Sequence, residues 1–272
     1  MFQRTARVAD HAQLADRTFR VRLECADIAA AIRPGQFVML RLPKTNDPLL
    51  GRPFALYDTI LENGNPVALD VVYLVVGKMT GKLQDVQVGE HLEVWGPLGR
   101  PFLDVGTPES VTFVAGGIGQ TPFLAYAREL LGERGFGGDA PRRRTQAVNL
   151  YYGVRTESLA AGVDDFRAAG VDVRMASDDG SVGFRGFVTQ LLESHGPTGP
   201  LVGCGPEPML HALTKVAAKW GVPCQVSLET PMACGVGICF SCVTKVQTPD
   251  GWDYKRVCVD GPAFDAAGLK WE

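Results

Sequence analysis

Short hydrophobic segments separated by turn-forming residues fill the first third of the chain. The clearest of them predict β-strands over residues 19–23, 37–42, 68–76 and 91–95. Sequences rich in proline, glycine and asparagine, at 33–35, 62–66 and 96–99, separate these segments. Short strands at regular spacing, with little helical periodicity, are typical of a small antiparallel barrel. We therefore expect residues 1–104 to form a β-barrel domain.

The pattern changes between residues 105 and 222, where apolar runs alternate with segments of helical periodicity. The runs predict strands at 111–115, 147–151, 171–175 and 200–204, and helices at 122–131, 158–169, 187–194 and 207–220. Alternating strands and helices predict a parallel sheet with right-handed crossovers. The polar segment 132–145 contains the basic run Arg142, Arg143 and Arg144. We interpret this segment as a mobile, solvated insertion on the surface.

The remaining residues, 223–272, show few helical signals and contain a cluster of cysteines. The chain has 272 residues, which predicts more than one domain, and its net charge of −3 gives no reason to expect nucleic-acid binding. No apolar run is long enough to span a bilayer, and the N-terminus lacks the apolar core of a signal peptide. We therefore expect a cytoplasmic protein. Clustered cysteines in that reducing compartment indicate metal or redox chemistry instead of disulfides.

Four of the seven cysteines have the spacing of a plant-type 2Fe–2S site. Cys234, Cys239 and Cys242 follow a C-x4-C-x2-C pattern, and Cys258 lies further along the chain. The glycines at 235 and 237 would let the backbone curl and direct its N–H groups at the sulfur atoms. Structural zinc and unrelated buried thiols are the alternatives, but zinc sites usually contain two closely spaced pairs.

Two segments of the predicted barrel suggest a flavin nucleotide. Arg52, followed by Pro53, Phe54 and Ala55, could pair with a pyrophosphate in a bidentate manner while the next residues run beside a flat ring. An ordinary strand entry is the alternative. Tyr73 and the loop 77–81 form the second candidate, in which a Thr hydroxyl and loop N–H groups could hold phosphate oxygens. An ordinary turn after a strand would explain the same sequence.

Two glycine-rich turns in the α/β region each connect an apolar strand to a helix. The first turn contains Gly116, Gly117, Gly119 and Thr121, and the second contains Cys204, Gly205 and Pro206. Glycines allow a pyrophosphate to approach the backbone closely, and both turns would lie at the carboxyl edge of the sheet, where α/β proteins bind ligands. The G-x-G-x-x-G fingerprint is not met. A single turn could serve packing alone, whereas the pair predicts a nucleotide site.

In this order, the motifs resemble the ferredoxin–NADP reductase superfamily over essentially the whole chain. Within it, the segments 228–242 and 256–264 are similar to the electron-transfer subunits of NAD-dependent (type B) dihydroorotate dehydrogenases. The resemblance implies an FAD-binding barrel at 1–104, an NAD-binding α/β domain at 105–222 and a 2Fe–2S module at 223–272.

The resemblance also assigns roles to individual residues. It implies that Arg52, Pro53, Phe54 and Ala55 form the Arg-Pro-x-Ser flavin motif, and that Cys204 lies near the nicotinamide. It implies ligation of the cluster by the four cysteines. It also implies further FAD contacts from Val72, Tyr73, Leu74, Met79 and Thr80. Two positions depart from the family: Ala55 replaces the usual Ser, and Met79 replaces a common Gly, so details of FAD placement are expected to differ.

The resemblance implies electron transfer from the flavin of a dihydroorotate dehydrogenase catalytic subunit, through 2Fe–2S and FAD, to NAD⁺, in pyrimidine synthesis. The expected assembly is a heterotetramer of two such subunits with two catalytic ones. No catalytic acid–base residue is expected in this chain. The alternatives are a subunit of an NAD(P)H–ferredoxin or sulfide-linked oxidoreductase, a stand-alone reductase, or a redox-sensing module. The choice between NAD and NADP stays open.

Overall fold

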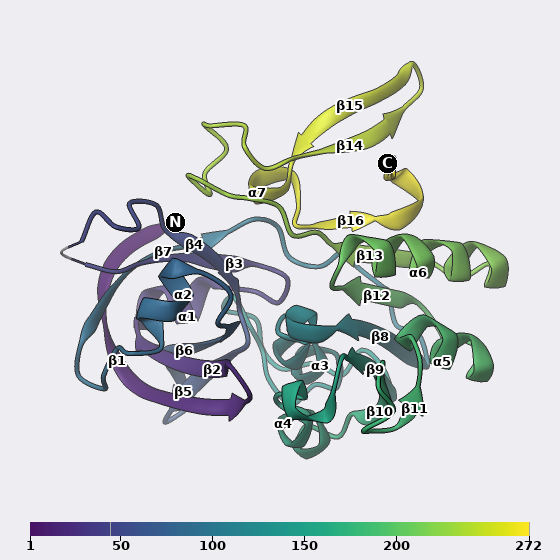
Figure 1. Cartoon of the computed structure of the whole chain (residues 1–272), viewed down its shortest axis with the longest axis horizontal. Helices are drawn as coiled ribbons and strands as arrows, with labels where there is room; N and C mark the ends of the chain where they lie inside the picture. Colours follow the sequence, from purple (N-terminus) through teal and green to yellow (C-terminus); the bar gives the residue numbers. More distant parts are fainter. Residues whose placement is uncertain (44, 272) are drawn as a thin grey trace.

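The computed structural model describes residues 1–43 and 45–271. Two seven-stranded sheets lie side by side, and a smaller lobe with a two-stranded hairpin projects beyond them (Figure 1). This architecture is the barrel, the nucleotide-binding sheet and the C-terminal module that the sequence predicts.

The first sheet is antiparallel and curves around its own core. Its order is β4-β3-β7-β1-β2-β6-β5. In β7, buried residues alternate with more exposed ones, as expected of a strand with one face on a core. The strands are β1 (Phe2–Ala15), β2 (Thr18–Glu24), β3 (Phe37–Arg41), β4 (Arg52–Ala55), β5 (Asp58–Glu62), β6 (Asn65–Leu74) and β7 (His91–Leu98).

Two short helices contribute side chains to the core of the barrel. The helices are α1 (Ala26–Ala31) and α2 (Lys78–Leu83). Ile28 from α1 and Met79 and Leu83 from α2 join the strand residues of this core. Neither helix was expected from the sequence. Each has only six residues, which is too short for helical periodicity to be recognised.

The second sheet is parallel except for its last strand, which runs antiparallel to its neighbour. Its order is β11-β10-β9-β8-β12-β13-β16. β8 is buried almost throughout, as expected of a central parallel strand covered on both faces. The strands are β8 (Ser110–Gly116), β9 (Ala147–Val154), β10 (Asp172–Ser177), β11 (Phe184–Arg185), β12 (Leu201–Cys204), β13 (Cys224–Ser227) and β16 (Ala263–Asp265).

Helices cover both faces of the second sheet (Figure 1). Side chains of α3 and α4 share a core with Phe113, whereas those of α5 and α6 share a core with Val114 on the opposite face. These helices are α3 (Phe123–Leu130), α4 (Val163–Ala168), α5 (Val188–His195) and α6 (Glu207–Trp220). The short 3₁₀ helices are η1 (Gly117–Gln120), η2 (Glu157–Leu159) and η3 (Ala266–Gly268).

The C-terminal lobe consists of the cysteine loop, a hairpin and a short helix. The hairpin pairs β14 (Val243–Thr248) with β15 (Gly251–Arg256), and α7 (Val257–Asp260) follows directly. The lobe does not stand apart from the second sheet, because β13 and β16, both from the region after residue 222, complete that sheet. The chain thus leaves the sheet after β13, forms the lobe and returns as β16.

Two expectations about the α/β region are wrong, the second of them only in part. The single helix expected at 158–169 is divided into η2 and α4, because Gly162 has a φ of +74° and interrupts it. The segment 132–145 is only partly the solvated insertion expected, because residues 138–143 are exposed but other parts of it pack against the barrel domain. Phe136 is buried in the barrel core, and Arg33 of the barrel region pairs with Asp139 at 2.9 Å. The segment therefore ties the two domains together.

Candidate cofactor sites

The two glycine-rich turns lie against each other at the carboxyl edge of the second sheet. They follow neighbouring parallel strands, in which Ala115 of β8 is paired with Cys204 of β12. A Cβ atom at Gly119 would collide with the carbonyl of Cys204 and lie 2.7 Å from the nitrogen of Gly205. A Cβ at Gly116 would lie 2.8 Å from Cδ of Pro206. Only glycine therefore allows this contact, and the predicted nucleotide residues come together.

The exposed side of the first turn offers backbone to a ligand. Gly117 has a φ of +55°, and a Cβ there would meet no atom within 4 Å. Thr121, which ends η1, is buried, and α3 begins two residues later. A bare turn that leads into a helix of eight residues can present N–H groups to a pyrophosphate. The residues present therefore fit a dinucleotide.

Cys204 is buried beside the second turn as a neutral thiol. Burial raises the pKa of Cys204 well above its usual value, and the nearby carboxylate of Glu229 raises it further. Desolvation by the surrounding protein also raises the pKa of Glu229. Since only the thiolate is a strong nucleophile, Cys204 is not set up for covalent catalysis.

The flavin motif forms β4, which pairs with β3 in the barrel. Arg52 is exposed, and its Nη1 donates at 3.0 Å to the carbonyls of Leu50 and Gly51, so the rest of the guanidinium is available to an anion. Phe54 is buried edge-on against Tyr73, with ring centroids 5.9 Å apart. Pro53 and Ala55 are half-buried. An arginine beside an apolar strand surface fits the pyrophosphate and ring of a flavin nucleotide.

Strand β6 carries three of the predicted FAD contacts, and its Tyr73 packs against Phe54 of the flavin motif. Val72 and Tyr73 are buried, and Leu74 is half-buried. The Tyr73 hydroxyl is 2.8 Å from Nε2 of His11, and burial raises the tyrosine pKa above its usual value. The tyrosine ring is therefore held in place by the barrel itself.

The predicted phosphate loop is the start of α2. The side chain of Met79 points into the barrel core. Oγ1 of Thr80 accepts hydrogen bonds from the N–H groups of Val76 and Gly77, at 3.0 and 3.1 Å, and donates to the Gly77 carbonyl. Both side chains therefore serve the local fold, and contacts from 79–80 to a phosphate would have to come from the backbone.

The four predicted cluster cysteines gather in the C-terminal lobe. Cys242 and Cys258 are buried, Cys234 is half-buried and Cys239 is exposed. Hydrogen bonds from Ser241, and then from Cys234, lower the pKa of Cys239 to about 6. Burial raises the pKa of Cys258 to about 12, and the neighbouring thiols of Cys242 and Cys234 contribute to this. Each sulfur thus lies within electrostatic reach of another.

The glycines of the cysteine loop adopt the left-handed conformations that a tight curl requires. Gly235 and Gly237 have φ values of +73° and +83°. The N–H of Val236 points at Sγ of Cys234 at 3.4 Å. Within the described ranges, no three His, Cys, Asp or Glu side chains are arranged to hold a single metal ion. Four soft cysteine sulfurs with backbone N–H donors nearby suit a two-iron cluster, which these cysteines would hold as thiolates.

Sequence reasoning missed two sets of residues at these sites. Oγ of Ser241 lies 3.2 Å from Sγ of Cys239, and its position before Cys242 could have suggested this contact. Asp58, Arg128 and Arg134 form an ion-pair network between the domains. The sequence gives no sign of this network, because Asp58 lies 70 residues from Arg128 and 76 residues from Arg134 along the chain.

Comparisons with known proteins agree with this geometry. The oxidoreductase FAD-binding domain model matches residues 6–102, and the model of the iron-sulfur cluster binding domain of dihydroorotate dehydrogenase B matches residues 229–270. The dihydroorotate dehydrogenase B (NAD(+)) electron transfer subunit of Desulforamulus reducens is 34% identical over 262 residues, 95% of each chain. The subunit of that name from Geobacillus thermodenitrificans is 35% identical, also over 95% of each chain. This chain belongs to that family of electron-transfer subunits.

Solved structures support the fold of this electron-transfer subunit family. A chain of an NADH-dependent reduced ferredoxin–NADP oxidoreductase, studied for flavin-based electron bifurcation, has a TM-score of 0.81 and 27% identity. The match covers 98% of this chain and 90% of that one. Phthalate dioxygenase reductase, at 18% identity and a TM-score of 0.64, shares the fold over 98% of this chain and 96% of its own. In the described part of the chain, no helix has the length and apolar character needed to cross a bilayer.

Proposed function

We propose that this subunit carries electrons from the flavin of a dihydroorotate dehydrogenase catalytic subunit to NAD⁺, in pyrimidine biosynthesis. The net reaction converts dihydroorotate and NAD⁺ into orotate, NADH and a proton. One observation carries the proposal: the cysteine loop of the C-terminal lobe exposes Cys239 at the surface, while the flavin and nicotinamide motifs lie on the two large sheets of the same chain. The names of the relatives at 34% and 35% identity support this reading.

The chain's own residues bind and orient in this proposal, and none acts as a catalytic acid or base. FAD, when bound, supplies the exchange between single electrons and a hydride. The site residues assigned from the sequence remain proposals: Arg52 for the flavin pyrophosphate, Gly117 and Gly205 for the nucleotide, and the four cysteines for 2Fe–2S. The neutral thiol of Cys204 would pack beside the nicotinamide. The proton chemistry on dihydroorotate would belong to the catalytic subunit.

The surface around the exposed cysteine would contact that partner. Ile238 is 80% exposed and Phe240 is 61% exposed, on either side of Cys239. Large exposed apolar side chains next to one another are typical of protein interfaces. We propose that these two residues dock on the catalytic subunit, in an assembly of two plus two chains.

We retain the division into an FAD domain at 1–104, an NAD domain at 105–222 and a cluster module at 223–272. β13 and β16 join the module to the NAD sheet. The cytoplasm is the proposed location, since all seven cysteines are free thiols, as expected in a reducing compartment.

A ferredoxin-linked oxidoreductase subunit is the second candidate. It is favoured by the likeness to the reduced ferredoxin–NADP oxidoreductase chain, which extends over 98% of this chain. The two candidates share FAD and the cluster and differ in the protein that exchanges electrons with the exposed face.

Co-expression distinguishes the two candidates. The chain would be produced with the dihydroorotate dehydrogenase catalytic subunit from the same genome, and dihydroorotate-dependent reduction of NAD⁺ would be followed by absorbance. The catalytic subunit alone is the control. Activity that requires both chains supports the proposal. No activity, from a complex shown to hold FAD and iron, would contradict it and favour the ferredoxin-linked function.

A further inference from the structure

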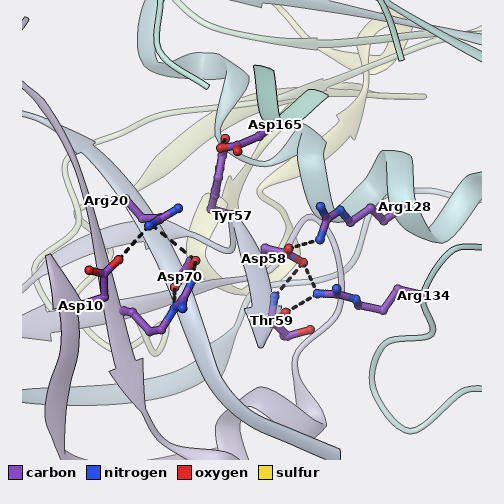
Figure 2. Close-up of polar contacts among 10 residues, drawn as sticks. Asp10, Arg20, Tyr57, Asp58, Thr59, Asp70, Arg128, Arg134 and Asp165 are labelled. Atoms are coloured by element: carbon purple, nitrogen blue, oxygen red, sulfur yellow. Dashed lines mark hydrogen bonds and ion pairs between the residues drawn. The ribbon is translucent and has the colours of Figure 1, made fainter. Parts of the chain in front are cut away.

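Asp58 is a buried carboxylate of the barrel whose two ionic partners come from the other domain. It begins β5, and its side chain is only 8% exposed. Nη1 of Arg134, from the segment after α3, lies 2.8 Å from Oδ1, and Nη1 of Arg128, on α3, binds Oδ2. Arg134 also donates to the carbonyl of Thr59. Figure 2 shows both guanidinium groups pointing at this one carboxylate.

The preceding residue makes a second polar contact across the same boundary. The hydroxyl of Tyr57 donates to Oδ2 of Asp165 on α4 at 2.6 Å (Figure 2). The carbonyl of Tyr57 accepts from the N–H of Ala125 on α3 at 3.1 Å. A Cβ at Gly162 would collide with the Tyr57 hydroxyl, so glycine is required there for α4 to approach.

These contacts join two elements that directly follow the cofactor motifs in the chain. Asp58 lies three residues after Ala55, the end of the flavin strand β4. Arg128 lies on α3, the helix that follows the first glycine turn. A rotation of one domain against the other would therefore change the flavin–nicotinamide geometry and stretch the Asp58 ion pairs together.

Apolar packing at the same interface holds the domains together with less directional control. Phe102 stacks on Tyr126 and Phe123, with centroids 4.5 and 6.0 Å apart. Hydrophobic burial is non-directional, whereas a guanidinium paired with a carboxylate has defined geometry. A fixed angle between the domains thus depends on the ion pairs more than on the ring stack.

We propose that Asp58 is a positioning residue, which through Arg128 and Arg134 fixes the nicotinamide domain against the flavin domain in the orientation that hydride transfer requires. The proposal rests on the FAD and NAD sites of the proposed function and is independent of the partner protein. In the half-reaction that tests it, a hydride leaves NADH and joins FAD, which gives NAD⁺ and FADH⁻.

The barrel contains a matched control. Asp70 on β6 is 4% exposed and also pairs with two arginines, but both lie in the barrel. Arg22 binds it through two hydrogen bonds of 2.8 and 2.9 Å, and Arg20 lies 3.7 Å away. Figure 2 shows the two networks side by side. Replacing Asp70 removes the carboxylate of Arg22 and leaves Arg20 paired with Asp10 at 2.7 Å. Replacing Asp58 removes the carboxylate of Arg134 and leaves Arg128 with Glu133 at 3.5 Å. Of the two aspartates, Asp58 is the one whose ion pairs join the domains.

The experiment compares Asp58→Asn with Asp70→Asn as FAD- and iron-loaded proteins at pH 8. Burial raises the pKa of Asp58 to about 6, so the wild-type carboxylate is ionised at this pH. Reduction of FAD by NADH would be followed by stopped-flow absorbance, with the long-wavelength charge-transfer band as a measure of ring stacking. A displacement of about 1 Å can slow a reaction by up to about 100-fold.

For Asp58→Asn we expect a limiting rate lowered about tenfold or more and a weaker charge-transfer band, because small displacements of the reacting atoms are costly. The Kd for NADH, which is set by turns within one domain, should change less than about twofold. Asp70→Asn should keep the wild-type rate and band. Equal rates in all three proteins, or equal losses in both variants, would overturn the proposal. A wild-type protein that NADH cannot reduce would instead refute the NAD site itself.

If Asp58→Asn does not retain FAD, a milder variant tests the positioning role. Arg134→Gln removes one ion pair and leaves Arg128 in place. We expect a rate lowered severalfold and faster hydrogen exchange of the Ala125 amide, which bonds across the interface. An unchanged rate together with unchanged exchange would overturn the proposal.

Discussion

The two ends of the proposed electron path differ in how the protein holds them. At the flavin–nicotinamide end, the two glycine turns pack against each other within one sheet, and the Phe102 ring stack and the Asp58 network lie between the two large domains. At the cluster end, Cys239, Ile238 and Phe240 lie on an exposed loop. A hydride needs atoms in contact, so its site must be rigid. A site that receives electrons from another protein must instead reach the surface.

The largest effect is expected at the flavin–nicotinamide end, on the rate at which NADH reduces FAD. Gly119→Ala would drive a Cβ into the Cys204 carbonyl and force the two glycine turns apart. Because both contacts are with backbone, neither can move aside as a flexible side chain would. We expect reduction of FAD by NADH to slow by about 100-fold or more, since misplacement of reacting groups carries costs of that order.

Stopped-flow reduction by NADH measures this prediction, and Gly268→Ala is the control. A Cβ at Gly268 would meet nothing within 4 Å, and its backbone is not left-handed. Wild-type kinetics in Gly119→Ala would mean that the contact between the turns does not shape the nicotinamide site.

An intermediate effect is expected at the exposed end. Phe240→Glu places a charge beside the cysteine loop and removes an exposed apolar side chain. Loss of an interface anchor typically costs 2 kcal/mol or more, which is about 30-fold in Kd. We expect the Kd for the catalytic subunit, measured by calorimetry, to rise by about that factor while FAD reduction by NADH stays unchanged.

Phe187→Glu is the matched control for this interface. Phe187 is 66% exposed and lies at the start of α5, on a different part of the molecule from the cysteine loop (Figure 1). Equal partner affinity in both variants would argue that the cysteine loop does not form the docking surface.

The smallest expected effect concerns the flavin edge of the barrel. Arg52→Ala removes an exposed guanidinium whose Nη1 donates to two backbone carbonyls and whose other N–H groups can bind an anion. Hydrogen bonds to charged groups contribute about 1.5–3 kcal/mol, so we expect flavin affinity to fall at least about tenfold. Arg7→Ala, which removes an exposed arginine of the barrel that pairs with Glu24 at 2.9 Å, is the control. Full flavin occupancy of Arg52→Ala after dialysis would show that Arg52 is only structural.

Features that depend on local sequence could be predicted, and those that depend on distant contacts could not. The spacing of Cys234, Cys239 and Cys242 lies within nine residues, and the structure gathers these cysteines with Cys258. The helix Glu207–Trp220 has the predicted bounds because Gly221 ends it in a left-handed conformation.

The errors share a physical cause. The polar composition of 132–145 suggested a solvated segment, but Phe136 is buried in another domain's core and Arg134 is neutralised by a distant aspartate. In each case a partner supplied by the fold decides the role of the residue, and that partner is not visible in the local pattern.

The central claim is that the cysteine cluster lies between the partner protein and FAD. Its most direct test compares wild type, Cys239→Ser and the control Cys224→Ser, each in complex with the catalytic subunit and assayed in both half-reactions. The account predicts that Cys239→Ser abolishes dihydroorotate-dependent reduction of NAD⁺ while NADH still reduces the FAD, and that Cys224→Ser retains both. Full transfer from dihydroorotate to NAD⁺ in Cys239→Ser would contradict it.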